Sequence, residues 1–112
     1  MGKLNSRVKG QNAEREIARI FQGYGYDCHR GQGIYQKGGI DTADVVGLPG
    51  IHIECKRQEN LNVHKAYEQA TRDAAGKAIP AVFHRRNRAP WMVTLSLEDF
   101  MEIYEAWEKI LE

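Results

Sequence analysis

The sequence predicts an α/β protein in which a mixed central β-sheet is flanked by helices. Its 112 residues suit one domain, so we expect residues 1–112 to form a single unit with its own core. Apolar residues make up 42% of the chain and charged residues 28%, as in an ordinary globular protein. Segments of helical and strand periodicity alternate in the order α-β-β-β-α-β-β-α, and this alternation indicates the class.

The N-terminal half predicts one helix and three strands. Residues 5–24 carry apolar side chains on one side at helical spacing, and glycines mark the end of this segment. Residues 26–30 form a plausible strand, and a glycine-rich loop covers residues 31–41. Residues 43–46 and 51–56 are strand-like, and the Gly-Leu-Pro-Gly turn between them predicts a hairpin.

The C-terminal half predicts a helix, two strands and a final helix. Residues 64–75 are compatible with a helix, and the strand-like segments 80–84 and 91–95 are joined by a basic loop over 85–90. Ser96, followed by an acidic residue three positions later, is a capping-box-like start for the last helix. An apolar stripe on this helix either covers the sheet or buries part of a twofold interface. The stripe consists of Phe100, Ile103, Tyr104, Trp107, Ile110 and Leu111.

Basic and acidic residues are divided unevenly along the chain. Residues 1–96 carry 15 Lys and Arg against 9 Asp and Glu, a balance of +6. Residues 97–112 carry one Lys against six acids, a balance of −5, and the two parts together give the net charge of +1. A basic body with an acidic tail suggests a polyanionic partner such as nucleic acid. The alternative is a solvated acidic helix without a function.

No segment predicts a membrane span or a secretion signal. No apolar run approaches the roughly 18–20 residues that cross a bilayer, and the first residues lack the apolar stretch of a signal peptide. We therefore expect a cytoplasmic protein, in the host cytoplasm if phage-encoded, with Cys28 and Cys55 as reduced thiols. These cysteines, His29 and His52 are not expected to bind zinc, because neighbouring candidates face opposite sides of their strands. We expect His52 to be a surface or packing histidine.

Two carboxylates and a lysine are expected to meet on neighbouring strands. Side-chain alternation places Glu54 and Lys56 on one face of strand 51–56, and Asp44 lies across the turn. Carboxylate oxygens suit Mg²⁺ or Mn²⁺, and a lysine beside them can hold an attacking water or stabilise charge on a phosphate. Glu14 leans toward the apolar side of the first helix, where a carboxylate needs a cation or metal. The alternatives are a solvated Glu–Lys pair, an unrelated Asp and a Glu that reaches solvent.

Two loops carry basic side chains that suit phosphate groups. Arginine pairs two phosphate oxygens at once, and a hairpin tip can reach into a groove of DNA. The glycine-rich loop is a second candidate for a DNA-contacting arm. The alternative is that both loops only increase solubility. The basic residues concerned are Arg85, Arg86 and Arg88 in the first loop, and Arg30 and Lys37 at the second.

At these residues the sequence resembles a known family. Asp44, nine residues and then Glu54-Cys55-Lys56 resemble the D…(D/E)-x-K core of the PD-(D/E)-x-K nuclease superfamily. Other stretches resemble archaeal-type Holliday junction resolvases and their small bacteriophage relatives. These stretches are KGQNAERE at 9–16, GY at 25–26, Arg30, DVVG at 44–47, LPGIHIECK at 48–56, EQA at 68–70 and HRRNRAPW at 84–91.

The resemblance implies a restriction-endonuclease-like fold and a Mg²⁺-dependent endodeoxyribonuclease, with Mn²⁺ able to substitute. It implies that Glu14, Asp44 and Glu54 bind one or two metal ions, helped by the Cys55 carbonyl. It also implies that Lys56 orients the attacking water or steadies the pentavalent phosphorane. The implied reaction is hydrolysis of a phosphodiester by metal-activated water.

The resemblance further implies that the protein is a homodimeric Holliday junction resolvase, which nicks branched DNA symmetrically and needs no organic cofactor. Gln69 would line the site, and Lys9 would contact DNA together with the basic loops. Three features depart from the family pattern. Ala43 stands where the superfamily has Pro, and the preceding loop lacks the serine of archaeal relatives. On a helical wheel, Gln69 also points away from the apolar stripe of its helix.

Two other functions remain open. The first is a nuclease of the same superfamily that acts on flaps, replication forks or duplex ends. The second is a non-catalytic DNA-binding module whose acidic cluster is structural. The lysine beside Glu54 favours a nuclease, because a pure binder gains little from carboxylates that repel phosphate.

Overall fold

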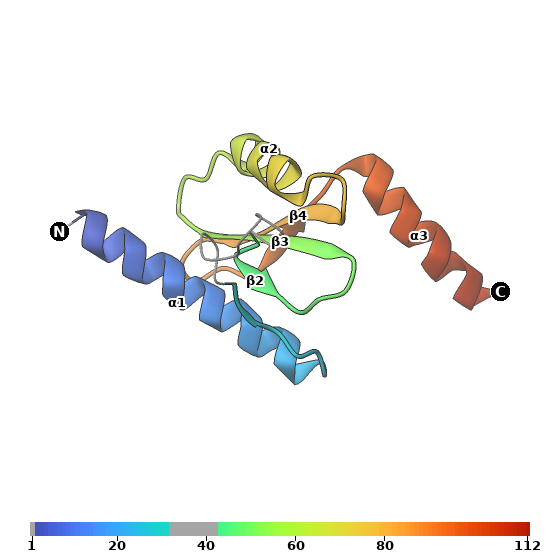
Figure 1. Cartoon of the computed structure of the whole chain (residues 1–112), viewed down its shortest axis with the longest axis horizontal. Coiled ribbons are helices and arrows are strands. Elements are labelled where there is room, and N and C mark those ends of the chain that lie inside the picture. The colour runs from blue at the N-terminus through green and yellow to red at the C-terminus, as the bar shows by residue number, and fades with distance from the viewer. Residues whose placement is uncertain (1, 32–42) are drawn as a thin grey trace.

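The computed structural model describes residues 2–31 and 43–112, with side chains from Arg7 onward in these ranges. The order of its elements, and a mixed sheet with flanking helices, confirm the predicted α/β class (Figure 1). The elements are α1 (Gly2–Gly23), β1 (His29–Arg30), β2 (Val45–Val46), β3 (Ile51–Arg57), α2 (Val63–Ala74), β4 (Ile79–Arg85), β5 (Met92–Thr94) and α3 (Leu97–Leu111).

The five strands form one sheet in the order β1-β2-β3-β4-β5. β3 and β4 pair in parallel along seven residues, whereas the other neighbours are antiparallel. A parallel pair needs a crossover, and α2 provides it. The predicted hairpin is confirmed, because Val45 in β2 pairs with Ile53 in β3. α1 and α2 therefore cover opposite faces of the sheet around β3 (Figure 1).

Both faces of β3 are buried. On one face Ile53 packs against α1, in a cluster that also contains a T-shaped pair of Phe21 and Phe83. On the other face α2 lies on Val82, and its contact side consists of alanines, which lets the helix approach the sheet closely. The alternation predicted for this strand is confirmed. Glu54, which is 1% exposed, is thereby held inside the protein on the side of α2.

Three predicted strands are shorter than expected, and one of them, at residues 91–95, is reduced to Met92–Thr94. Only His29–Arg30 of residues 26–30 forms a strand, because the N–H of Tyr26 donates to the carbonyl of Phe21 and prolongs the turn after α1. Residues 43–44 precede β2 rather than belong to it. The turn after β2 requires glycine at position 47, where φ is +111° and a Cβ would overlap the carbonyl oxygen of Asp27.

The last helix begins as predicted but does not cover the sheet. The side chain of Ser96 accepts a hydrogen bond from the N–H of Asp99 at 3.0 Å, which caps α3. α3 extends away from the sheet, and none of its residues, all of which are described, is buried (Figure 1). Its aromatic side chains contact one another along the helix instead. Within the described residues, no helix combines the length and apolar character that crossing a membrane requires.

Candidate functional site

A cavity of about 440 Å³ lies between α1, the start of β2, the end of β3 and α2. The five residues predicted to be catalytic come from four separate segments, and the structure brings all of them to this cavity. They are Glu14, Asp44, Glu54, Lys56 and Gln69. The helical wheel pointed Gln69 away from the apolar stripe of α2, yet this residue lines the cavity. Their roles remain predictions, but their convergence is a property of the fold.

Glu54 and Lys56 project from the same face of β3, because they are two positions apart in a strand. The Lys56 ammonium lies 3.6 Å from Oε2 of Glu54, and its side chain is 26% exposed. Oε1 of Glu54 is buried and has no hydrogen-bond partner among the described residues. A buried carboxylate oxygen without a donor is unfavourable unless a cation compensates it. This orphaned oxygen is the first sign that the cavity is built for a metal ion.

Hydrogen bonds with neighbouring backbone groups hold Asp44 in place. Its carbonyl accepts from the N–H of Gly31 at 2.8 Å, and its own N–H donates to the carbonyl of Ile53 at 3.0 Å. Its side-chain Oδ2 accepts from the N–H of Cys55 at 2.8 Å. The thiol of Cys55 packs in the core toward α1, so this residue contributes its backbone N–H to the site. A Cβ at position 31 would overlap the carbonyl oxygen of Ala43, so glycine is required there.

The two central carboxylates bind protons more tightly than usual. Burial raises the pKa of Asp44 from 3.8 to about 6, and the charge of Glu14 adds to this rise. Burial, followed by the charge of Asp44, raises the pKa of Glu54 from 4.5 to about 7. Crowded carboxylates of this kind are stabilised by a divalent cation, and an all-oxygen set matches Mg²⁺ or Mn²⁺. The residues present therefore fit the predicted metal.

Glu14 is oriented by an arginine that was expected to contact DNA. Nε of Arg30 donates to Oε1 of Glu14 at 2.9 Å, and the glutamate side chain is 19% exposed. The ion pair joins β1 to α1 beside the cavity. Arg30 therefore has a clear partner within the protein, and its guanidinium fixes a predicted metal ligand. Lys9 lines the same cavity. Lys37 lies outside the described residues.

A network around Glu16 was not predicted from the sequence. Its carboxylate accepts from Arg85 at 3.0 Å and from the indole N–H of Trp91 at 3.2 Å, and Arg57 lies 3.6 Å away. Burial alone would raise the pKa of Glu16, but the hydrogen bonds from Arg85 and Trp91, together with the charges of Arg85 and Arg57, outweigh burial and lower the pKa. Arg85 was placed in the basic loop, yet it ends β4 and its side chain is only 12% exposed.

The remaining predicted DNA contacts lie at the surface. Arg86 and Arg88 are exposed in the loop between β4 and β5.

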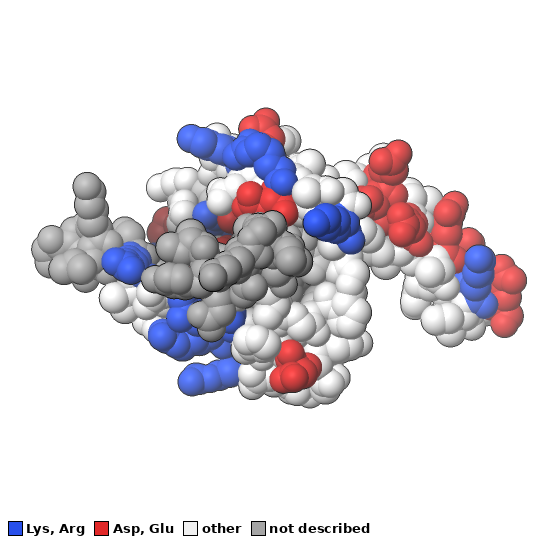
Figure 2. Space-filling view, viewed as in Figure 1, with Lys and Arg blue, Asp and Glu red and all other residues white. Residues whose placement is uncertain are grey.

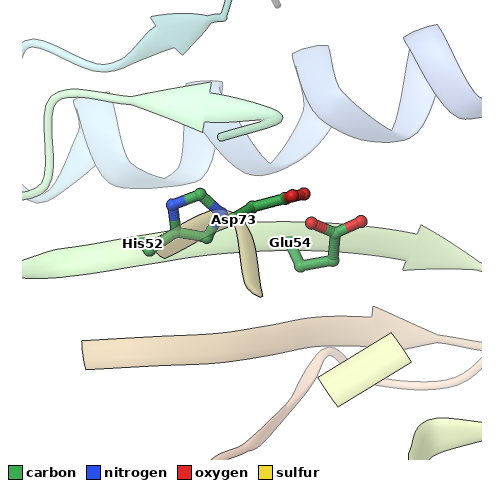
Figure 3. A group of neighbouring side chains, drawn as sticks. All are labelled: His52, Glu54 and Asp73. Atoms are coloured by element: carbon green, nitrogen blue, oxygen red, sulfur yellow. The ribbon is translucent and has the colours of Figure 1, made fainter. Parts of the chain in front are cut away.

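Sequence reasoning also missed Asp73, whose carboxylate reaches from α2 toward Glu54 and His52 on β3 (Figure 3). Its helical position three residues beyond Ala70, which contacts the sheet, is the signal that could have identified it.

Comparisons with known proteins agree with this fold. The family model described as phage putative PDDEXK endonuclease matches residues 5–111. Among solved structures, the chain is similar to Hjc, a Holliday junction resolvase from the archaeal hyperthermophile Archaeoglobus fulgidus. That similarity has a TM-score of 0.57 and 24% sequence identity, and covers 78% of this chain and 72% of Hjc. At this identity the likeness shows a shared fold. No curated protein sequence matches the chain.

Proposed function

Because the chain belongs to the phage putative PDDEXK endonuclease family, we propose that it is a metal-dependent, structure-specific DNA endonuclease that resolves Holliday junctions. One observation carries this proposal: Glu14, Asp44, Glu54 and Lys56 line a single cavity, although they come from distant parts of the chain. Residues 1–112 would act as one nuclease domain. A DNA substrate would place the protein in the cytoplasm, in the host cell if a phage encodes it.

Glu14, Asp44 and Glu54 would hold one or two Mg²⁺ ions, for which Mn²⁺ could substitute. A bound ion would lower the pKa of a coordinated water and neutralise charge on the phosphate. The chain's own residues provide the rest. Cys55 fixes the Asp44 carboxylate through its N–H, and its carbonyl is a further proposed ligand.

Lys56 is proposed to act on the phosphodiester directly. Its side chain is partly exposed to the cavity while its ammonium stays near Glu54. From there it would orient the attacking water or donate to a phosphate oxygen as negative charge develops. Gln69 would contact the same scissile phosphate from α2. Water attack forms the new phosphorus–oxygen bond, and the bond to the leaving oxygen breaks, which leaves a nick.

The charge distribution supports DNA as the substrate. Basic side chains lie over the body of the protein, whereas acidic side chains gather on α3 (Figure 2). Arg86, Arg88 and Lys9 would contact phosphates, which makes binding salt-dependent and independent of base sequence. The acidic helix would be repelled by DNA and would point away from it.

We further propose that the protein is a homodimer that uses α3. Two symmetric nicks need two sites related by a twofold axis, and a dimer supplies them. Among the described residues, nothing buries the apolar side chains of α3, and Leu97, Trp107, Ile110 and Leu111 are each more than half exposed. The adjoining edge strand β5 also exposes two apolar side chains. A stable interface buries about 800 Å² per partner, and we propose that α3 and β5 form it.

The test is cleavage of an end-labelled four-way junction with Mg²⁺, beside duplex, flap and single-strand controls. Paired symmetric nicks on the junction alone are expected. Asp44→Asn and Glu54→Gln should abolish these nicks while junction binding persists. Cleavage of flaps or duplex instead would keep the metal site and reject the junction as substrate. Tight junction binding without any cleavage would favour a DNA-binding module.

A further inference from the structure

The geometry points to a second metal site, formed by His52, Glu54 and Asp73, that takes a first-row transition-metal dication, with Zn²⁺ the first candidate. One ligand atom from each of the three side chains lies within 4.8 Å of the other two. His52 and Glu54 project from the same face of β3, and Asp73 reaches them from the last turn of α2 (Figure 3). This site shares only Glu54 with the proposed catalytic centre and does not depend on what DNA the protein cleaves.

The burial of the cluster supports a bound cation. His52 is 6% exposed and Glu54 is 1% exposed, so two of the three ligands are held away from water. Oε1 of Glu54 has no hydrogen-bond partner among the described residues, and its other oxygen lies beside Lys56. A carboxylate can bind one cation through each oxygen. Glu54 is therefore placed to bridge the catalytic centre and the second site.

A cavity next to the cluster leaves room for the ion and its waters. His52 and Asp73 line a space of about 220 Å³ that is bounded by residues of β2, by Lys77 and by the turn before β3. A water molecule occupies about 30 Å³ of liquid, so several fit. Three protein ligands and an open position for water are the usual arrangement of Zn²⁺ in non-structural sites.

The ligand types distinguish this site from the catalytic one. An imidazole nitrogen with two carboxylate oxygens suits Zn²⁺, whereas an all-oxygen set suits Mg²⁺. Millimolar Mg²⁺ should therefore fill the catalytic centre without displacing Zn²⁺ from the second site.

The experiment is a Zn²⁺ titration of the full chain by calorimetry, after removal of metals and in excess Mg²⁺. The wild type should bind one Zn²⁺ per chain. Asp73→Asn should weaken this binding beyond the about 10–100-fold that loss of a second-shell contact causes. Asp44→Asn, which alters only the catalytic centre, should still bind Zn²⁺. His64→Gln, at an exposed position on α2, is the matched control and should bind like the wild type.

A second measurement identifies the ligand without using activity. In ¹⁵N NMR spectra of the histidine rings, Zn²⁺ should shift the His52 signals and leave the His64 signals in place. Circular dichroism of metal-free Asp73→Asn checks that this variant is folded. Three results would overturn the site: no Zn²⁺ binding in excess Mg²⁺, retained binding by Asp73→Asn, or loss of binding in Asp44→Asn. Junction cleavage by the wild type is scored separately, so failure of either proposal is distinguishable.

Discussion

The metal-free protein should become more stable at neutral pH when Glu54 is replaced by Gln. In the folded state the pKa of Glu54 lies near 7 rather than 4.5, because the carboxyl is buried beside Asp44. The folded protein therefore binds this proton more tightly than the unfolded chain. Its free energy of unfolding is highest where Glu54 is protonated, and falls as the pH rises from about 4.5 through about 7.

The size of the effect follows from the difference between the two pKa values. A change from 4.5 to about 7 corresponds to about 3 kcal/mol once both states are ionised. Asp44 and Glu54 titrate as a coupled pair, so part of this energy is shared and about 2–3 kcal/mol is expected for Glu54 alone. Gln has nearly the same shape and does not ionise. The stability of Glu54→Gln relative to wild type should rise by that amount between about pH 4.5 and about pH 8.

Urea denaturation with a chelator present, at both pH values, measures the effect as a shift in midpoint at constant slope. Glu68→Gln is the matched control, because it makes the same chemical change at an exposed position of α2. Added Mg²⁺ should stabilise the wild type more than Glu54→Gln, because it binds the ionised folded site. A stability difference that is the same at both pH values, or that shrinks as the pH rises, would refute the argument.

Four other changes test separate parts of the structure. Lys56→Ala should lower junction cleavage at least about hundredfold with binding retained in a gel-shift assay, and unchanged turnover would remove it from the mechanism. Arg30→Gln should weaken Mg²⁺ affinity about 10–100-fold by releasing its carboxylate partner on α1, whereas the exposed Arg19→Gln should not. Trp107→Asp should convert the proposed dimer to a folded monomer by light scattering, and a dimer that persists would place the interface elsewhere. Glu16→Gln should lower the free energy of unfolding by about 1–3 kcal/mol in thermal or urea denaturation, and an unchanged midpoint would show that its network contributes little.

The features that the sequence predicted well depend on local periodicity. The period-two pattern of β3 correctly separated Ile53 from Glu54. Glu14, which was predicted to lean toward the apolar side of its helix, lines the cavity. The order of elements followed from the same patterns and from glycine-rich turns. These properties are set by neighbours within a few residues, which a single sequence displays directly.

The features that were missed depend on contacts between distant residues. Glu16 meets Arg85 and Trp91 across separations of 69 and 75 residues, so periodicity on α1 alone could not reveal its partners. Arg85 looked like part of a basic loop because its neighbours are basic, but β4 extends to include it. The position of α3 was also left open. An apolar stripe shows that a surface is to be covered, but not which surface covers it.

The hydrogen bond between the N–H of Cys55 and the carboxylate of Asp44 links the site to local opening of the sheet. That amide proton can exchange with solvent only when an opening motion separates it from the Asp44 carboxylate. The same opening would move Asp44 away from Glu54 and disrupt the site. The hydrogen-exchange rate of this one amide therefore reports how often the site opens. A ligand that bridges the two carboxylates should slow this exchange, because it stabilises the closed state of the site.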